Sequence, residues 1–100
     1  MNTNIREKVA ELNGYTMIDT TNTYSPYTGE FSCEVKGFKN GNYELIPFYE
    51  LSLDAIAQVF NEHKLTWGLD SDGYAYSLKT KAYAETPALA LCKLFIELME

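Results

Sequence analysis

Three stretches of the chain repeat apolar residues at helical spacing. Asn4 and Glu7 predict a capping box at the start of the first, and Gly14 predicts its end. Ser52 is predicted to cap the second helix, and Thr86, which precedes a proline, the third. The apolar stripes are Ile5, Val9 and Leu12; Leu53, Ile56, Ala57 and Phe60; and Ala88, Leu91, Cys92, Phe95, Leu98 and Met99.

Between the first two helices, residues 30–38 alternate between apolar and polar side chains, as a half-buried strand does. The dipeptide Asn40-Gly41 follows, which is the preferred two-residue hairpin turn. This turn fixes a register that gives the hairpin one apolar face. The expected cross-strand pairs are Lys39–Asn42, Val35–Ile46 and Cys33–Phe48.

Upstream of this hairpin, residues 15–19 predict a short strand. The polar residues 20–29 predict an exposed loop, because threonine, serine, proline and glycine dominate them. The loop is expected to be either a binding loop or a connector.

A second hairpin is predicted after the middle helix, with residues 70–73 as a four-residue loop. Alternating apolar residues on both sides of this loop again fall on one face. The expected pairs are Leu69–Tyr74, Trp67–Tyr76 and Leu65–Leu78.

The order of elements predicts one α+β domain over residues 1–100, with three helices packed on an antiparallel sheet from two hairpins. The residues expected to be buried in its core are Phe31, Cys33, Val35, Ile46, Phe48, Ile56, Phe60, Trp67, Tyr76, Leu91, Cys92 and Phe95.

The charge balance changes the expected partners. The net charge is −6, from 8 basic and 14 acidic residues, and the basic residues are scattered singly. Nucleic-acid binding needs clustered cations, so we expect no direct contact with DNA or RNA. The chain also lacks a signal-peptide pattern and a membrane-spanning apolar run, so we expect a cytoplasmic protein with no membrane contact.

Residues that could carry chemistry are few, and each has a structural interpretation. His63 has no nucleophile or carboxylate in a recognisable motif. Cys33 and Cys92 lie in apolar stripes, where free cysteine acts as a small buried hydrophobe. The loop 70–73 begins like a calcium loop but lacks its later ligands. We therefore expect no enzyme, catalytic residue, metal site or cofactor.

Tyrosine is more suggestive, because it is enriched in recognition surfaces. The candidate interaction residues in loops and strands are Tyr24, Tyr27, Tyr43, Leu45 and Tyr74. The alternative is that strands simply favour tyrosine.

The last helix carries more apolar residues than one sheet face can cover. Leu94 and Ile96 lie outside its main stripe and complete the candidate interaction set. Either a homodimer buries this surface, through the helix or an open strand edge, or the first helix covers it within the monomer.

Residues 6–15 (Arg-Glu-Lys-Val-Ala-Glu-Leu-Asn-Gly-Tyr) resemble the opening helix of the phage "ABA sandwich" domain family. Residues 52–56 and 86–92 are similar to its central and last helices, and residues 20–48 depart from it. The resemblance implies a layered α+β fold and a phage accessory role, and it carries over no catalytic residue.

The resulting expectation is a non-enzymatic protein that binds and modulates a bacterial host protein, such as a defence or takeover target. The alternatives are a small-molecule or nucleotide sponge with a tyrosine-lined pocket, and a hydrolase whose site the sequence does not reveal.

Overall fold

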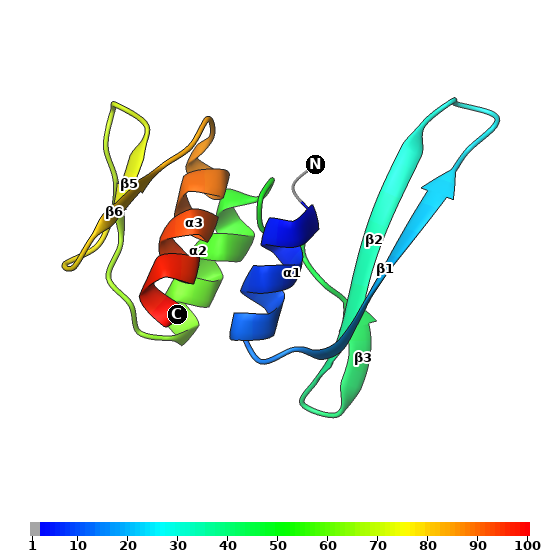
Figure 1. Cartoon of the computed structure of the whole chain (residues 1–100), viewed down its shortest axis with the longest axis horizontal. Helices are drawn as coiled ribbons and strands as arrows, with labels where there is room; N and C mark the ends of the chain where they lie inside the picture. Colours follow the sequence, from blue (N-terminus) through cyan, green and yellow to red (C-terminus); the bar gives the residue numbers. More distant parts are fainter. Residues whose placement is uncertain (1–2) are drawn as a thin grey trace.

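Three helices lie between two antiparallel sheets in the computed structural model, which describes residues 3–100 (Figure 1). The elements are α1 Thr3–Leu12, β1 Thr16–Tyr24, β2 Phe31–Lys39, β3 Asn42–Leu45, α2 Leu53–Glu62, β4 Gly68–Leu69, β5 Tyr74–Tyr76, β6 Lys81–Tyr83 and α3 Pro87–Met99. One sheet has the order β1-β2-β3 and packs on α1. The other has the order β4-β5-β6 and packs on α3, which also contacts α1 and α2. The α+β class is confirmed, with the two predicted hairpins in separate sheets.

The helix ends follow from local chemistry. Ser52 and Thr86 act as the predicted caps, accepting hydrogen bonds from backbone N–H groups three residues later at 3.3 and 3.2 Å. Gly14 has φ +98°, the left-handed conformation expected just after α1. Helix α1 begins at Thr3, so Asn4 lies inside the helix and not at its cap; the Asn4 side chain is outside the described part.

The core forms where the three helices meet. The rings of Phe60 and Phe95 pack edge to face with centroids 5.7 Å apart. Burial is confirmed for seven predicted core residues: Val35, Ile46, Ile56, Phe60, Leu91, Cys92 and Phe95. Cys33 and Trp67 are half-buried. The prediction is wrong for Phe31, Phe48 and Tyr76, which are exposed.

The turn Asn40-Gly41 is confirmed, with both residues at positive φ and Lys39 paired with Asn42. The register holds as far as Ile46, whose N–H donates to the Val35 carbonyl at 2.7 Å. Strand β3 has already ended at Leu45, and Pro47 has no N–H with which to continue the ladder. The expected Cys33–Phe48 pair is therefore wrong, and Cys33 pairs with Asn22 of β1.

Strand β1 is longer than expected. It continues through Tyr24, so residues 20–24 are strand and only residues 25–30 connect it to β2. A bulge at Met17, which has φ 52°, interrupts its pairing near the start. Threonine is a β-branched residue that suits strands, and this composition outweighs the polarity that suggested a loop.

The second hairpin is shifted by one residue from the expected register, because Leu69 pairs with Ala75 and not with Tyr74. The N–H of Asp70 donates to the Tyr74 carbonyl at 3.0 Å, which closes a three-residue loop with Gly73 at φ +90°. A one-residue shift exchanges the faces of a strand. Ala75 is therefore buried, and Tyr76 and Leu78 face outward. Strand β6, which no pattern predicted, pairs with β5.

Candidate functional site

The far parts of β1 and β2, with the turn between them, form an arm over residues 19–36. Figure 1 shows this arm standing away from the helices, with its turn on the side where α1 begins. The molecule is accordingly elongated, with extents of 45 × 33 × 19 Å. Two-stranded ribbons are marginally stable in water by themselves.

The end of the arm carries an exposed aromatic cluster. The rings of Tyr24 and Phe31 contact each other, with centroids 4.8 Å apart. Phe31 is 79% exposed and Tyr27, in the turn, is 97% exposed. A hollow of about 540 Å³ lies beside Phe31 and is lined also by Asn22, Ser32 and Cys33. The other exposed aromatic pair of this sheet, Phe38 and Tyr43, is less exposed, at 37% and 47%.

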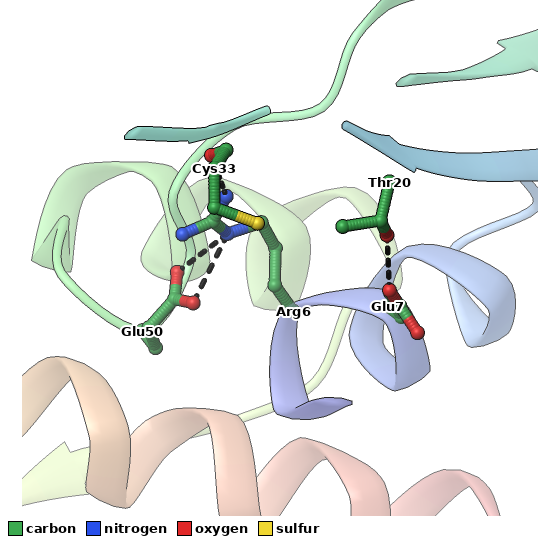
Figure 2. A network of polar contacts seen from close by, with 5 residues as sticks. All are labelled: Arg6, Glu7, Thr20, Cys33 and Glu50. Atoms are coloured by element: carbon green, nitrogen blue, oxygen red, sulfur yellow. Dashed lines mark hydrogen bonds and ion pairs between the residues drawn. The ribbon is translucent and has the colours of Figure 1, made fainter. Parts of the chain in front are cut away.

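The arm is fastened at its base by a buried ion pair. The Arg6 Nε donates to both carboxylate oxygens of Glu50, at 2.9 and 3.0 Å, and both side chains are at least nine-tenths buried (Figure 2). The Arg6 Nη1 donates to the Cys33 carbonyl at 3.1 Å. The Arg6 guanidinium also lies 3.9 Å from the centre of the Phe48 ring. Arg6 thus donates a hydrogen bond to a backbone carbonyl of β2 at a position where β2 no longer pairs with β3.

A second contact holds β1 to the same helix. The Thr20 hydroxyl donates to the carboxylate of Glu7 (Figure 2). The predicted capping box with Glu7 is therefore wrong, and Arg6 beside it is buried, because the sheet lies over this face of α1.

A polar hollow of about 300 Å³ lies between α2 and the turn of β2 and β3. The Tyr15 hydroxyl donates to Glu44 at 2.8 Å, and the Lys39 ammonium lies 5.3 Å from the centre of the Tyr15 ring. Lys39 is also 3.8 Å from a carboxylate oxygen of Glu62. Burial, together with the hydrogen bond to Glu44, raises the pKa of Tyr15 above its usual value. Burial also raises the pKa of Tyr49, so both phenols keep their protons at neutral pH.

Behind this hollow, a hydrogen-bonded chain accounts for the single histidine. His63 Nε2 donates to the Asn13 amide oxygen at 2.8 Å, and the Asn13 amide nitrogen donates to the Tyr49 hydroxyl at 3.4 Å. The His63 ring packs against Phe95, with centroids 5.3 Å apart. These contacts fit the structural interpretation of His63.

The predicted interaction residues do not form one surface. Tyr24 and Tyr27 lie on the arm, and exposed Tyr43 and Leu45 lie on β3, where Tyr43 stacks on Phe38. Tyr74 is in the other sheet and packs on Tyr83. Leu94 is 0% exposed and Ile96 is half-buried, so Leu94 is wrong as a surface residue. Helix α1 packs on α3, so the first helix covers part of the apolar surface of the last helix within the monomer, as one of the two alternatives predicted.

Sequence reasoning missed Phe31, Arg6, Tyr15 and Tyr49. Phe31 follows the same alternation as Cys33 and Val35, which predicted it to be buried. Because residues 20–24 were expected to form a loop, the length of the ribbon that carries Phe31 away from the core was not predicted. No sequence signal could have joined Arg6 to Glu50, since 44 positions separate them.

The remaining chemical groups are accounted for by structure. Burial raises the pKa of the Cys92 thiol to about 12, which keeps it protonated and unreactive. The Asp70 carboxylate accepts from the N–H groups of Asp72 and Tyr74, as a turn requires. Among residues 3–100 no group of histidine, cysteine and carboxylate side chains is arranged to hold a metal ion. None of the helices in that range is long and apolar enough to cross a bilayer.

Comparisons with protein-family models, with curated proteins and with solved structures give no match. The phage-family resemblance stays a prediction from the residues.

Proposed function

We propose that this chain is a small phage-type accessory protein, non-enzymatic, that binds and modulates a bacterial host protein through its arm. One observation carries the proposal, namely the cluster of Tyr24, Tyr27 and Phe31 exposed at the far end of a projecting ribbon. Exposed contiguous apolar surface on a small protein marks interaction sites. The host-side partner is the class that the resemblance to phage domains implies.

Two further features support the arm as the binding element. Tyrosine and phenylalanine give a large contact area at a small cost in side-chain entropy. The base of the arm is held by Arg6 and Glu50, so the aromatic cluster is presented in a defined direction. A partner that covers the cluster would also stabilise a ribbon that is marginal alone.

The test compares three proteins as bait in bacterial lysate, with bound proteins quantified by mass spectrometry. Wild type is expected to retain one stoichiometric protein, and Phe31→Ser to lose it. Leu78→Ser is the matched control, because Leu78 is 90% exposed in the turn between β5 and β6, away from the arm. The purified partner should then bind wild type in calorimetry and change its own activity on binding.

The proposal fails if no partner is stoichiometric, or if Phe31→Ser and Leu78→Ser retain it equally. Circular dichroism of each variant shows whether the fold is kept. Because Phe31 is exposed, both variants are expected to keep it.

A second candidate function rests on the polar hollow around Tyr15 and Tyr49, which could hold a small polar molecule. Lys39 is the one cation in its lining, and Glu44 and Glu62 are its carboxylates, so the lining favours an amine over a nucleotide. Heating purified protein should release such a molecule for mass spectrometry. Glu44→Gln should lower its occupancy while Glu97→Gln, on α3, should not. An empty wild-type protein that binds no amine would exclude this function.

A further inference from the structure

We infer that the free edge of β1 pairs with the same edge of a second copy of the chain, antiparallel about a two-fold axis at Asn22. This goes beyond the proposed function, since it uses the backbone edge of the arm. Phe31 lies on β2, one strand away from this edge.

The hydrogen bonds within the arm show which backbone groups of β1 are free. The Ser25 N–H donates to the Glu30 carbonyl at 2.9 Å, so the backbone of Ser25 points across to the β2 side, as a member of a hydrogen-bonded pair does. Such pairs alternate along an antiparallel ladder. With Thr21 opposite Glu34, odd residues of β1 therefore bond to β2. The N–H and C=O groups of Thr20, Asn22 and Tyr24 point to the open edge.

The other edge of β2 confirms this alternation. The carbonyl of Val35 accepts from Ile46, and the carbonyl of Cys33 accepts from Arg6. Odd residues of β2 thus point away from β1, as the pairing requires. Beyond Val35 this side of β2 is bonded by Arg6, and the other edge strands β3, β4 and β6 are only four, two and three residues long. Strand β1 is the one long edge left open among the described residues.

Between Thr20 and Tyr24 this edge carries no charge, proline or bulge that would hinder pairing. Natural edge strands carry lysine, inward charges or proline, or are kept short. Residues 20–29 contain no charged side chain and form the longest uncharged run of the chain, although the net charge is −6. Two acidic molecules could therefore meet here without placing like charges opposite each other. A strand from a basic partner would gain no charge complementarity at this edge, so the charge pattern favours the second copy.

The register follows from the free groups and the bulge. The bulge at Met17 ends the regular edge on one side, and Pro26 ends it on the other. Placing Asn22 on the axis sets Thr20 opposite Tyr24 of the partner and forms about six backbone hydrogen bonds. It also brings the two Asn22 amides together, and each amide offers both a donor and an acceptor. The product is a closed four-stranded ribbon with an aromatic cluster at each end.

The first test is the mass in solution, measured by light scattering over the micromolar range without any host partner. We expect a concentration-dependent rise from 11.4 kDa towards twice that value. A mass that stays at 11.4 kDa throughout overturns the inference. That result would leave the proposed function standing, because its test rests on Phe31, which lies on β2 and not on this edge.

The second test uses two variants at the axis. Asn22→Pro removes an N–H that points to the open edge and leaves the ladder with β2 intact. Asn22→Lys places two ammonium groups against each other. Both should remain monomeric with an unchanged circular dichroism spectrum, while Ser71→Lys, in the exposed turn of the other hairpin, should dimerise like wild type. A dimer that survives both Asn22 variants overturns the inference.

Amide exchange followed by NMR locates the interface without substitution. The amides of Asn22 and Tyr24 should become protected as protein concentration rises, and those of β4 and β6 should not change. Dimerisation without protection at Asn22 would place the contact elsewhere and contradict the inference.

Discussion

Arg6 is the residue that joins the arm to the helices. Its guanidinium contacts Glu50 from the loop before α2, the Cys33 carbonyl from β2 and the Phe48 ring. Two charges buried together cost desolvation, which their attraction repays only when the geometry is good. Here the distances of 2.9 and 3.0 Å meet that condition, and no buried side-chain nitrogen or oxygen of the described residues lacks a partner.

Removing one charge of this pair should therefore be costly. Glu50→Gln leaves the buried Arg6 without a counter-ion, and we expect a loss of about 3–5 kcal/mol in the free energy of unfolding. Urea denaturation measures it. Lys8→Met is the control, since Lys8 forms an exposed pair with Glu100 and its loss should change the midpoint little. Equal midpoints for the two variants would contradict the role given to Arg6.

The buried phenols predict a loss of stability at alkaline pH. The pKa values of Tyr15 and Tyr49 are raised in the folded state, so the unfolded chain releases these protons first. The contribution of these two phenols to the free energy of unfolding is fully present below pH 10, and it should fall as the pH rises above 10. Denaturation at a series of pH values measures the slope. Tyr49→Phe should reduce the slope, and exposed Tyr27→Phe should leave it unchanged.

Among the elements, α3 shows how an apolar surplus can mislead. The helix is packed on α1, α2 and the sheet β4-β5-β6, so residues outside its main stripe are buried as well. A prediction from one helix alone has no information about how many neighbours it will have. The surplus on α3 indicated a neighbour correctly, and the neighbour is within the chain.

A charge introduced into α3 should separate these possibilities. Leu94→Glu places a carboxylate at a fully buried position, so we expect loss of the cooperative unfolding transition and not release of a folded monomer. Circular dichroism during heating measures it. Lys93→Glu, at the adjacent exposed position, should keep the fold. A folded Leu94→Glu protein would show that α3 is packed differently.

Elements defined by local chemistry were predictable. The turn at Asn40-Gly41 and the caps at Ser52 and Thr86 follow from a few neighbouring residues. The second hairpin was missed by one residue because Asp70 and Gly73 suit both a three-residue and a four-residue loop. Packing against α3 selects the three-residue loop, since only the observed register places the small side chain of Ala75 beneath α3. The outer part of the arm could not be predicted, because threonine, which dominates residues 20–23, is common in both loops and strands.

On the scale of the whole molecule, the net charge and the projecting arm affect binding to partners in different ways. The net charge of −6 acts over the entire surface, whereas Tyr24 and Tyr27 of the arm lie in the uncharged residues 20–29 and Phe31 directly follows Glu30. Contacts made by the arm thus depend little on salt, and long-range attraction depends on the acidic body.

We expect no binding of random duplex DNA or RNA at physiological salt. Nucleic acids attract proteins by exchanging counter-ions for clustered cations, and the 8 basic residues of this chain are scattered among 14 acidic ones. A gel-shift titration measures this. Micromolar binding that weakens steeply with added salt would contradict the charge argument.

The contact between the arm and the core ends at Val35. Val35 is the last residue on its inner face that is fully buried, and beyond it Cys33 and Phe31 become progressively exposed. Substitutions past this point scarcely touch the folding of the body, so binding and not folding constrains the sequence of the outer arm. Its length is less free, because adding one residue to each strand would turn the aromatic cluster to the opposite face. Viable length variants should therefore grow or shrink by two residues on each strand.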